Sequence, residues 1–304
     1  MVRHWFLVPA FGGSNPSIPA KKITRTRVLF SCYDISMTKN TSQKTIIITG
    51  ASAGIGEAAA RELAKDNNVV IVGRSKRTRK VAKELGVDYY QADYANLESV
   101  RTLAKDLLKA YPKIDLLVNN AGGIMKSIVM TKDGFEQTFQ VNYLAQFLLT
   151  DLLMDRLIAS KGAVINTSSA AHRFARLHLD NLQFASAPFV AYGNGKLLDL
   201  IHAQELARRY SAKGVDAVSF HPGVVATNFA SATNGPFAWM YNTSAKALLK
   251  TPAQGADTLV WLANNRPLWQ NGGYYSKRKL SAIGGLARDP AVGSKIWDIT
   301  EKLF

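Results

Sequence analysis

Short runs of apolar, mostly β-branched residues alternate along this chain with longer segments whose apolar residues recur every three or four positions. The short runs predict strands, most of them apolar enough to be buried on both faces of a sheet. The predicted strands cover 45–48, 69–72, 87–91, 114–118, 163–166, 215–220 and 273–275. The longer segments predict helices over 56–65, 78–85, 97–111, 134–158 and 192–212, with a further helix after Pro252.

This alternation predicts an α/β fold in which helices cover both faces of a mainly seven-stranded parallel sheet with right-handed connections. No linker and no internal repeat interrupts residues 45–304. We therefore expect a single domain over 44–304.

The first 43 residues are expected to form an N-terminal extension outside this domain. Residues 1–36 carry five basic side chains against one acid, Asp34, and have no sustained helical or strand period. They are open to interpretation as a short signal core, as an organelle transit peptide, or as an upstream extension that is disordered or not native. We favour the third, with Met37 as the true start, because residues 37–40 lead directly into the first strand.

The composition limits the function classes. Of 304 residues, 47% are apolar and 20% charged, and no apolar run approaches the roughly 20 residues that span a bilayer. Cys32 is the only cysteine, and no Cys/His cluster has metal-ligand spacing, so neither an intrachain disulfide nor a metal site is expected. The basic residues behind the net charge of +16 are spread along the chain, which argues against nucleic-acid binding. A cytoplasmic location is expected.

A glycine-rich turn joins the first strand to the first helix. Gly50, Gly54 and Gly56 have the spacing Gly-x-x-x-Gly-x-Gly. Glycine allows positive φ and a close approach of the backbone to a ligand. The helix that follows directs its amide groups and its positive dipole end at the turn, where a pyrophosphate can bind. The turn therefore predicts a nucleotide site.

The end of the second strand indicates which nucleotide. No acid lies between Asp66 and Glu84 to bond a ribose 2′-hydroxyl, and Arg74-Ser75 follow the strand. A guanidinium can bind a 2′-phosphate, and charge-assisted bonds of this kind contribute roughly 1.5–3 kcal/mol. This corresponds to an about ten- to hundredfold preference for NADPH over NADH, unless Arg74 is only a solvated surface residue. NADP(H) is the expected cofactor, with NAD(H) as the alternative.

Tyr192 and Lys196 lie four residues apart and would share one face of a helix. A free phenol has a pKa near 10. An ammonium about 4 Å away, at an effective dielectric of about 20, would stabilise the phenolate by roughly 4 kcal/mol and lower the pKa by roughly three units. The phenol would then approach the range in which general acid–base catalysis is efficient.

Together these features resemble the short-chain dehydrogenase/reductase family over nearly all of 45–304. The matching motifs, in chain order, are residues 49–56, Asp93, residues 119–122, Asn142, Ser168-Ser169, Tyr192, Lys196 and residues 221–227. Residues 133–136, 142–150 and 204–209 resemble more narrowly the branch of retinol dehydrogenases and WW-domain-oxidoreductase-like proteins. Gly193 and Gly195 depart from that branch, which more often has larger residues there. The resemblance implies a Rossmann-like doubly wound fold.

The resemblance also implies roles for single residues. Asn142, Ser169, Tyr192 and Lys196 match the family's catalytic tetrad, with Ser168 as a rival for Ser169. Tyr192 would exchange a proton with the substrate oxygen, Ser169 would hydrogen-bond that oxygen, Lys196 would grip the nicotinamide ribose, and Asn142 would hold a water. Asn142 as a packing residue and Asp93 as a turn cap are the competing interpretations. The expected cofactor-binding residues are Gly50, Ser52, Gly54, Ile55, Gly56, Arg74, Ser75, Asp93, Asn120, Ala121, Gly122, Tyr192, Lys196, Pro222, Gly223, Val225 and Thr227.

Two apolar, irregular segments, 170–190 and 228–250, are expected to shape the substrate pocket. They predict a small hydrophobic aldehyde, ketone or alcohol as substrate, with loose membrane association as a further expectation. Family resemblance implies a homodimer or homotetramer that pairs through the helices over 134–158 and 191–212. The hypothesis is thus an NADP(H)-dependent oxidoreductase, and the alternative is a catalytically quiet NADP-binding regulatory protein.

Overall fold

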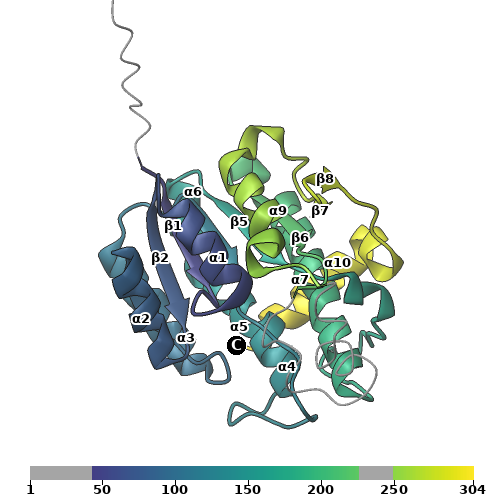
Figure 1. Cartoon of the computed structure of the whole chain (residues 1–304). Coiled ribbons are helices and arrows are strands. Elements are labelled where there is room, and N and C mark those ends of the chain that lie inside the picture. Colours follow the sequence, from purple (N-terminus) through teal and green to yellow (C-terminus); the bar gives the residue numbers. More distant parts are fainter. Residues whose placement is uncertain (1–42, 226–248) are drawn as a thin grey trace, which may run out of the picture. The chain divides into compact units, whose positions relative to one another are not determined.

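The structure is a computed structural model that describes residues 43–225 and 249–304. Its sheet has the strand order β3-β2-β1-β4-β5-β6-β7-β8 (Figure 1). The strands are β1 (Thr45–Thr49), β2 (Asn68–Gly73), β3 (Asp88–Gln91), β4 (Leu116–Asn119), β5 (Ala163–Thr167), β6 (Asp216–His221), β7 (Tyr274–Ser276) and β8 (Lys279–Leu280). Neighbours from β3 to β7 pair in parallel, which confirms the predicted parallel sheet. The short antiparallel strand β8 was not predicted.

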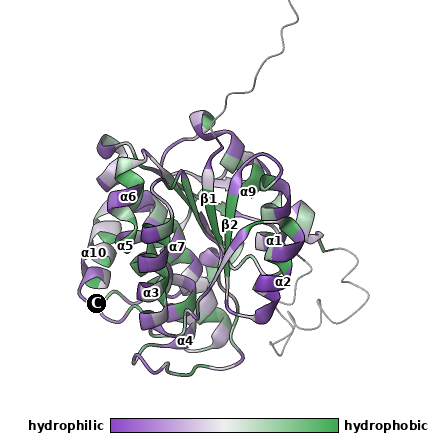
Figure 2. Ribbon diagram, turned by 90° about the vertical axis from the view of Figure 1, so that its left-hand side faces the viewer, coloured by the Kyte–Doolittle hydropathy of each residue, from purple (hydrophilic) through white to green (hydrophobic). Residues whose placement is uncertain are grey.

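Helices cover both faces of this sheet, as predicted. They are α1 (Gly54–Leu63), α2 (Lys76–Leu85), α3 (Leu97–Ala110), α4 (Gln137–Phe139), α5 (Ala145–Leu152), α6 (Met154–Ala159), α7 (Pro188–Tyr210), α9 (Pro252–Asn264) and α10 (Pro290–Glu301). Figure 2 shows α3, α5, α7 and α10 on one side of the apolar strands and α1, α2 and α9 on the other. Two separate cores result, because alternate residues of each strand face opposite layers.

The helix predicted over 134–158 is wrong in its bounds and continuity. Gly134 has φ 84°, a left-handed conformation that no helix continues, and Glu136 caps α4 by accepting hydrogen bonds from Thr138 N and Phe139 N at 2.9 and 2.7 Å. A π-helical turn, η1 (Gln140–Leu144), then separates α4 from α5. A break at Leu153 separates α5 from α6.

The C-terminal helix α10, which was not predicted, packs over α5 and α7. Its Trp297 lies with ring centroids 4.7 Å from Phe147 of α5 and 5.8 Å from His202 of α7. Residues 145–150 of α5 are all buried. Trp297 of α10 thus packs on both helices that were expected to pair two subunits. In the described part of the chain, no helix is both long and apolar enough to cross a membrane.

Candidate functional site

The candidate site is a cavity of about 1010 Å³ at the carboxyl ends of the parallel strands. It lies where the strand order reverses between β1 and β4, the position at which open α/β sheets bind ligands. The predicted residues that line it are Gly50, Ser52, Gly54, Ile55, Arg74, Ser75, Asp93, Asn120, Ala121, Gly122, Ser169, Tyr192, Lys196, Pro222, Gly223 and Val225. Gly56 and Asn142 are not among the lining residues, and Thr227 lies outside the described residues.

The glycine turn has the conformation that a phosphate cradle requires. Gly50 and Gly54 adopt φ 66° and 61°, and a Cβ on Gly50 would lie 2.7 Å from Ala121 Cα. Ala53, which precedes α1, provides no side-chain cap to the first amides of that helix. These amides face the turn, so the turn and the first turn of α1 together fit a pyrophosphate.

Gly56 packs closely against the end of β4. A Cβ there would lie 2.5 Å from Asn120 Nδ2 and 2.6 Å from Gly50 O. The Asn120 amide in turn donates to Thr49 O at 2.9 Å, and Thr49 Oγ1 accepts from Asn120 N and Ala121 N at 2.9 and 3.0 Å. These contacts join the ends of β1 and β4, and they hold both the turn and the floor of the cavity.

Three charged residues, Arg74, Arg77 and Asp93, line the end of the cavity near β2. Arg74 is exposed, follows β2 directly and lines the cavity beside Ser75. Its neighbour Arg77 donates instead to Ser52 O at 2.7 Å and to Glu57 at 3.0 Å. Asp93 lines the cavity and also accepts a hydrogen bond from Ala95 N at 3.1 Å, so its turn-capping role is present in the structure.

The geometry favours Ser169 over Ser168 as the residue that faces a substrate. Ser168 is buried, and its hydroxyl donates to Lys196 O at 2.6 Å. Both serines are among the lining residues, but among the described residues the Ser169 hydroxyl only accepts a bond, from Ala171 N at 3.2 Å, and so keeps its own proton available to donate.

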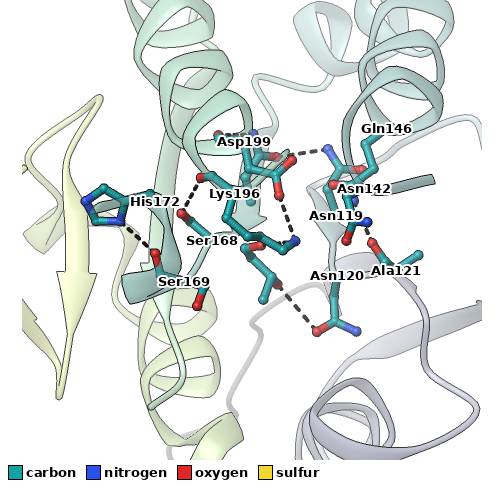
Figure 3. Close-up of polar contacts among 12 residues, drawn as sticks. Asn119, Asn120, Ala121, Asn142, Gln146, Ser168, Ser169, His172, Lys196 and Asp199 are labelled. Carbon is teal, nitrogen blue, oxygen red and sulfur yellow. Dashed lines mark hydrogen bonds and ion pairs between the residues drawn. The ribbon is translucent and has the colours of Figure 1, made fainter. Parts of the chain in front are cut away.

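Tyr192 and Lys196 open onto the same cavity from one face of α7. Lys196 Nζ lies 5.7 Å from the Tyr192 ring centroid. The ammonium donates to Thr167 O at 2.8 Å and forms an ion pair with Asp199 Oδ2, also at 2.8 Å (Figure 3). The ammonium that sequence reasoning treated as a lone charge is thus countered by a carboxylate, which was missed although Asp199 follows Lys196 by three residues.

Asn142 lies in the π-helical turn η1 and is fully buried. Its amide group donates to Gly123 O and Thr138 O at 2.9 and 3.0 Å, and it accepts from Gly123 N at 2.9 Å. A Cβ on Gly122 would lie 2.5 Å from Asn142 Oδ1 and 3.4 Å from Lys196 Nζ. The Asn142 side chain therefore fixes residues 122–123, which form one wall of the cavity beside Lys196.

The structure explains the two glycines on α7. A Cβ on Gly193 would lie 3.0 Å from Ala171 O, in the 3₁₀ turn η2 (Ala170–Phe174). A Cβ on Gly195 would lie 3.1 Å from Asn142 Cβ. The two glycines therefore let α7 approach both walls of the site closely. The packing gained by this close approach offsets the low helix propensity of glycine.

Asn194, between them, was also missed. Its amide accepts from Arg176 N at 2.7 Å and donates to Arg176 O and Phe184 O at 3.3 and 3.1 Å. These bonds attach the segment 175–187 to α7. In the apolar segment 170–190 that was expected to form the pocket wall, Phe174 and Phe189 line the cavity, whereas Leu182 is in the core. Residues 228–248 of the second segment lie outside the described residues.

The two histidines near the site are neutral supports. Burial, together with the nearby Lys250 charge, lowers the pKa of His221 to about 4, and His221 Nδ1 accepts from Ala170 N at 3.3 Å. Burial also lowers the pKa of His172, whose Nδ1 lies 2.6 Å from Ser169 O. Residues 43–225 and 249–304 contain no group of three acidic, histidine or cysteine side chains that could hold a metal ion.

With this geometry established, the comparison with protein families is decisive. The model of the family described as short chain dehydrogenase matches residues 44–236. The chain belongs to the short-chain dehydrogenase/reductase family. It is therefore an oxidoreductase of a family that uses nicotinamide cofactors.

Relatives confirm the predicted retinol-dehydrogenase-like branch. "Putative daunorubicin C-13 ketoreductase DnrU" of Streptomyces sp. (strain C5) is 41% identical over 268 residues, which cover 84% of this chain and 90% of that protein. Retinol dehydrogenase 14 of Homo sapiens is 32% identical over 286 residues, with 85% of each chain covered. A short chain dehydrogenase from Shigella flexneri 2a strain 301, solved in complex with NADP, has a TM-score of 0.62 and 25% identity over 78% of this chain and 97% of its own.

Proposed function

We propose that this chain is an NADP(H)-dependent oxidoreductase that transfers hydride between the nicotinamide and a hydrophobic carbonyl or alcohol, with Tyr192 as the general acid/base. One observation carries the proposal: Ser169, Tyr192 and Lys196 line the same cavity as the glycine turn. A dinucleotide whose pyrophosphate lies at the turn can therefore extend toward the hydroxyl groups of the site.

The bound nicotinamide would supply or accept the hydride. In the reductive direction Tyr192 donates its proton to the carbonyl oxygen, and in the oxidative direction it accepts the proton of the alcohol. Ser169 donates a hydrogen bond to the same oxygen and stabilises the charge that develops there. Lys196 has three donors, of which Thr167 O and Asp199 take two in the described structure, and the third would be available to a ribose hydroxyl of a bound nucleotide.

The preference for NADPH rests on Arg74. It is exposed at the end of β2, lines the cavity and has no acidic neighbour at that strand end. The neighbouring Arg77 is held by Ser52 O and Glu57, so Arg74 is the residue positioned to bind a 2′-phosphate. The structural relative solved with NADP supports this preference.

The substrate class rests on the cavity wall. Ile124 and Phe189 pack with Tyr192, and Val141 and Phe174 line the same cavity, where Phe174 is 64% exposed. Such a wall favours an apolar carbonyl compound over a charged one. The names of the relatives, a ketoreductase and retinol dehydrogenases, support the same class.

The test is NADPH oxidation with a panel of hydrophobic aldehydes and ketones, with the wild-type protein beside Tyr192→Phe. The phenyl ring keeps the packing of α7 but removes the proton. We expect turnover by the wild type and a loss of at least about 100-fold in kcat for the variant. Equal turnover by both proteins would refute Tyr192 as the acid/base, and NADPH binding without turnover across the panel would favour the regulatory alternative.

A further inference from the structure

Asp199 is a buried carboxylate that the reaction outlined above does not use. Its side chain is fully buried, and Oδ2 lies 2.8 Å from Lys196 Nζ. Its other oxygen, Oδ1, is buried without a hydrogen-bond partner in the described part of the chain. Desolvation by burial raises the pKa of Asp199 to about 6, although the Lys196 ammonium acts in the opposite direction.

Such a pair is not explained by stability. Removing two charges from water costs more than their attraction commonly returns, and here one carboxylate oxygen lacks a donor among the described residues. Strongly perturbed carboxyl groups instead concentrate at functional sites. Asp199 is in contact with Lys196, whose ammonium lies 5.7 Å from the Tyr192 ring centroid.

Two titratable side chains near the Lys196–Asp199 pair carry no charge of their own. Burial lowers the pKa of His202 to about 3 and raises the pKa of Tyr143, so both are neutral at physiological pH. The neighbouring strands and α5 contribute amides: Asn166 donates to Asp199 O at 3.0 Å, Asn119 donates to Asn166 Oδ1 at 3.0 Å, and Gln146 lies beside them in Figure 3.

We propose that Asp199 is a positioning residue for the reaction: its carboxylate holds the Lys196 ammonium against the Thr167 carbonyl and offsets part of the positive field at Tyr192. The inference rests on the proposed function of Tyr192. The Lys196 ammonium lies 5.7 Å from the Tyr192 ring centroid. A lone positive charge about 6 Å away, at an effective dielectric of about 20, would lower the titration midpoint of a phenol by about two pH units. A carboxylate 2.8 Å beyond the ammonium, and so about 9 Å away, removes about two thirds of that displacement.

The test compares Asp199→Asn, which keeps the volume and removes the charge, with Asp216→Asn. Asp216 is also ion-paired, with Arg266 at 2.7 Å, but it begins β6 at the opposite end of the sheet from the site. Tyrosine ¹³Cζ NMR follows the titration of Tyr192 in the protein without substrate, and the resonance is assigned by its loss in Tyr192→Phe. We expect the midpoint to fall by about one pH unit in Asp199→Asn and to stay unchanged in Asp216→Asn.

In Asp199→Asn, the pH at which kcat for carbonyl reduction decreases on the alkaline side should fall by the same amount as the Tyr192 midpoint. A midpoint that stays in place or rises in Asp199→Asn would overturn the inference. Should Asp199→Asn fail to fold, Asp199→Leu removes the charge with an apolar side chain, and the same fall is expected. The NMR titration needs no substrate, so the two hypotheses can fail separately. A lower Tyr192 midpoint in Asp199→Asn, with no turnover by the wild type, would refute only the proposed function. Turnover by the wild type with an unchanged midpoint in Asp199→Asn would refute only the role of Asp199.

Discussion

The hydrogen bonds of Asn194 give a prediction whose size follows from the structure. Asn194 is 3% exposed, and its amide makes three bonds to the backbone of the segment 175–187. Each such bond contributes about 0.5–1.5 kcal/mol net, or about 3 kcal/mol together. Asn194→Ala loses them and regains about 0.6 kcal/mol in helix propensity, so the free energy of unfolding should fall by about 2 kcal/mol.

Urea denaturation followed by circular dichroism measures this fall. Asn265→Ala is the matched control, because that side chain makes a single bond, to Trp261 O at 2.8 Å, far from the site. Hydrogen exchange separates the local effect from the global one. We expect amides of 175–187 to lose protection in Asn194→Ala well before the sheet does, since these bonds attach the segment to α7.

The segment adjoins Phe174 and Phe189 of the cavity wall, so its release should raise KM for a hydrophobic carbonyl substrate more than it lowers kcat. An Asn194→Ala protein with wild-type stability and unchanged exchange over 175–187 would refute the view that Asn194 holds this wall.

Three further predictions concern the cofactor, pH and association. Arg74→Ala should weaken NADPH binding about ten- to hundredfold without changing NADH binding, as measured by fluorescence titration. The control Arg79→Ala, at another exposed arginine, should change neither affinity. Equal losses for both cofactors would contradict the assignment of Arg74 to the 2′-phosphate. Burial lowers the pKa of His202 to about 3. As the pH falls, the unfolded protein therefore binds a proton at this histidine before the folded protein does. The free energy of unfolding should fall by about 2 kcal/mol between pH 6.5 and 5. His202→Phe should lack this part of the slope in urea titrations, and an unchanged slope would argue against a neutral buried His202. Hydrogen exchange over α5 should be the same in dilute and concentrated protein, because α10 covers this helix, and protection that grows with concentration would show pairing through it.

Much of this architecture is predictable because its signals are local. Buried strands such as Thr45–Thr49 are continuous apolar runs, and the turn at Gly50 and Gly54 needs residues that adopt positive φ. The parallel sheet follows from the alternation of such strands with helices. The same local pattern hides the π-helical turn at Gln140–Leu144, since the apolar spacing continues through it.

The features of the fold and the site that could not be predicted depend on contacts between distant segments. The pairing of Lys196 with Asp199 is visible as an i, i+3 spacing, but on most helices that spacing marks a solvated surface pair. Only the packing of α7 against the sheet shows that both groups are buried. The helix α10 did carry a signal, because Asp289 caps it and Pro290 occupies its first turn. Its position over α5 and α7, which decides the exposure of those helices, is a tertiary property.

The most direct test of the account is the transfer of deuterium from [4-²H]NADPH, with both C4 stereoisomers used in parallel, to a hydrophobic ketone. Mass spectrometry of the alcohol product reports whether the nicotinamide hydrogen reaches the former carbonyl carbon. The account predicts that the wild type incorporates one deuterium from one of the two stereoisomers, and that Tyr192→Phe with NADPH bound yields at most about 1% as much alcohol in the same time. Alcohol without deuterium from either isomer, or equal yields from the two proteins, would contradict it.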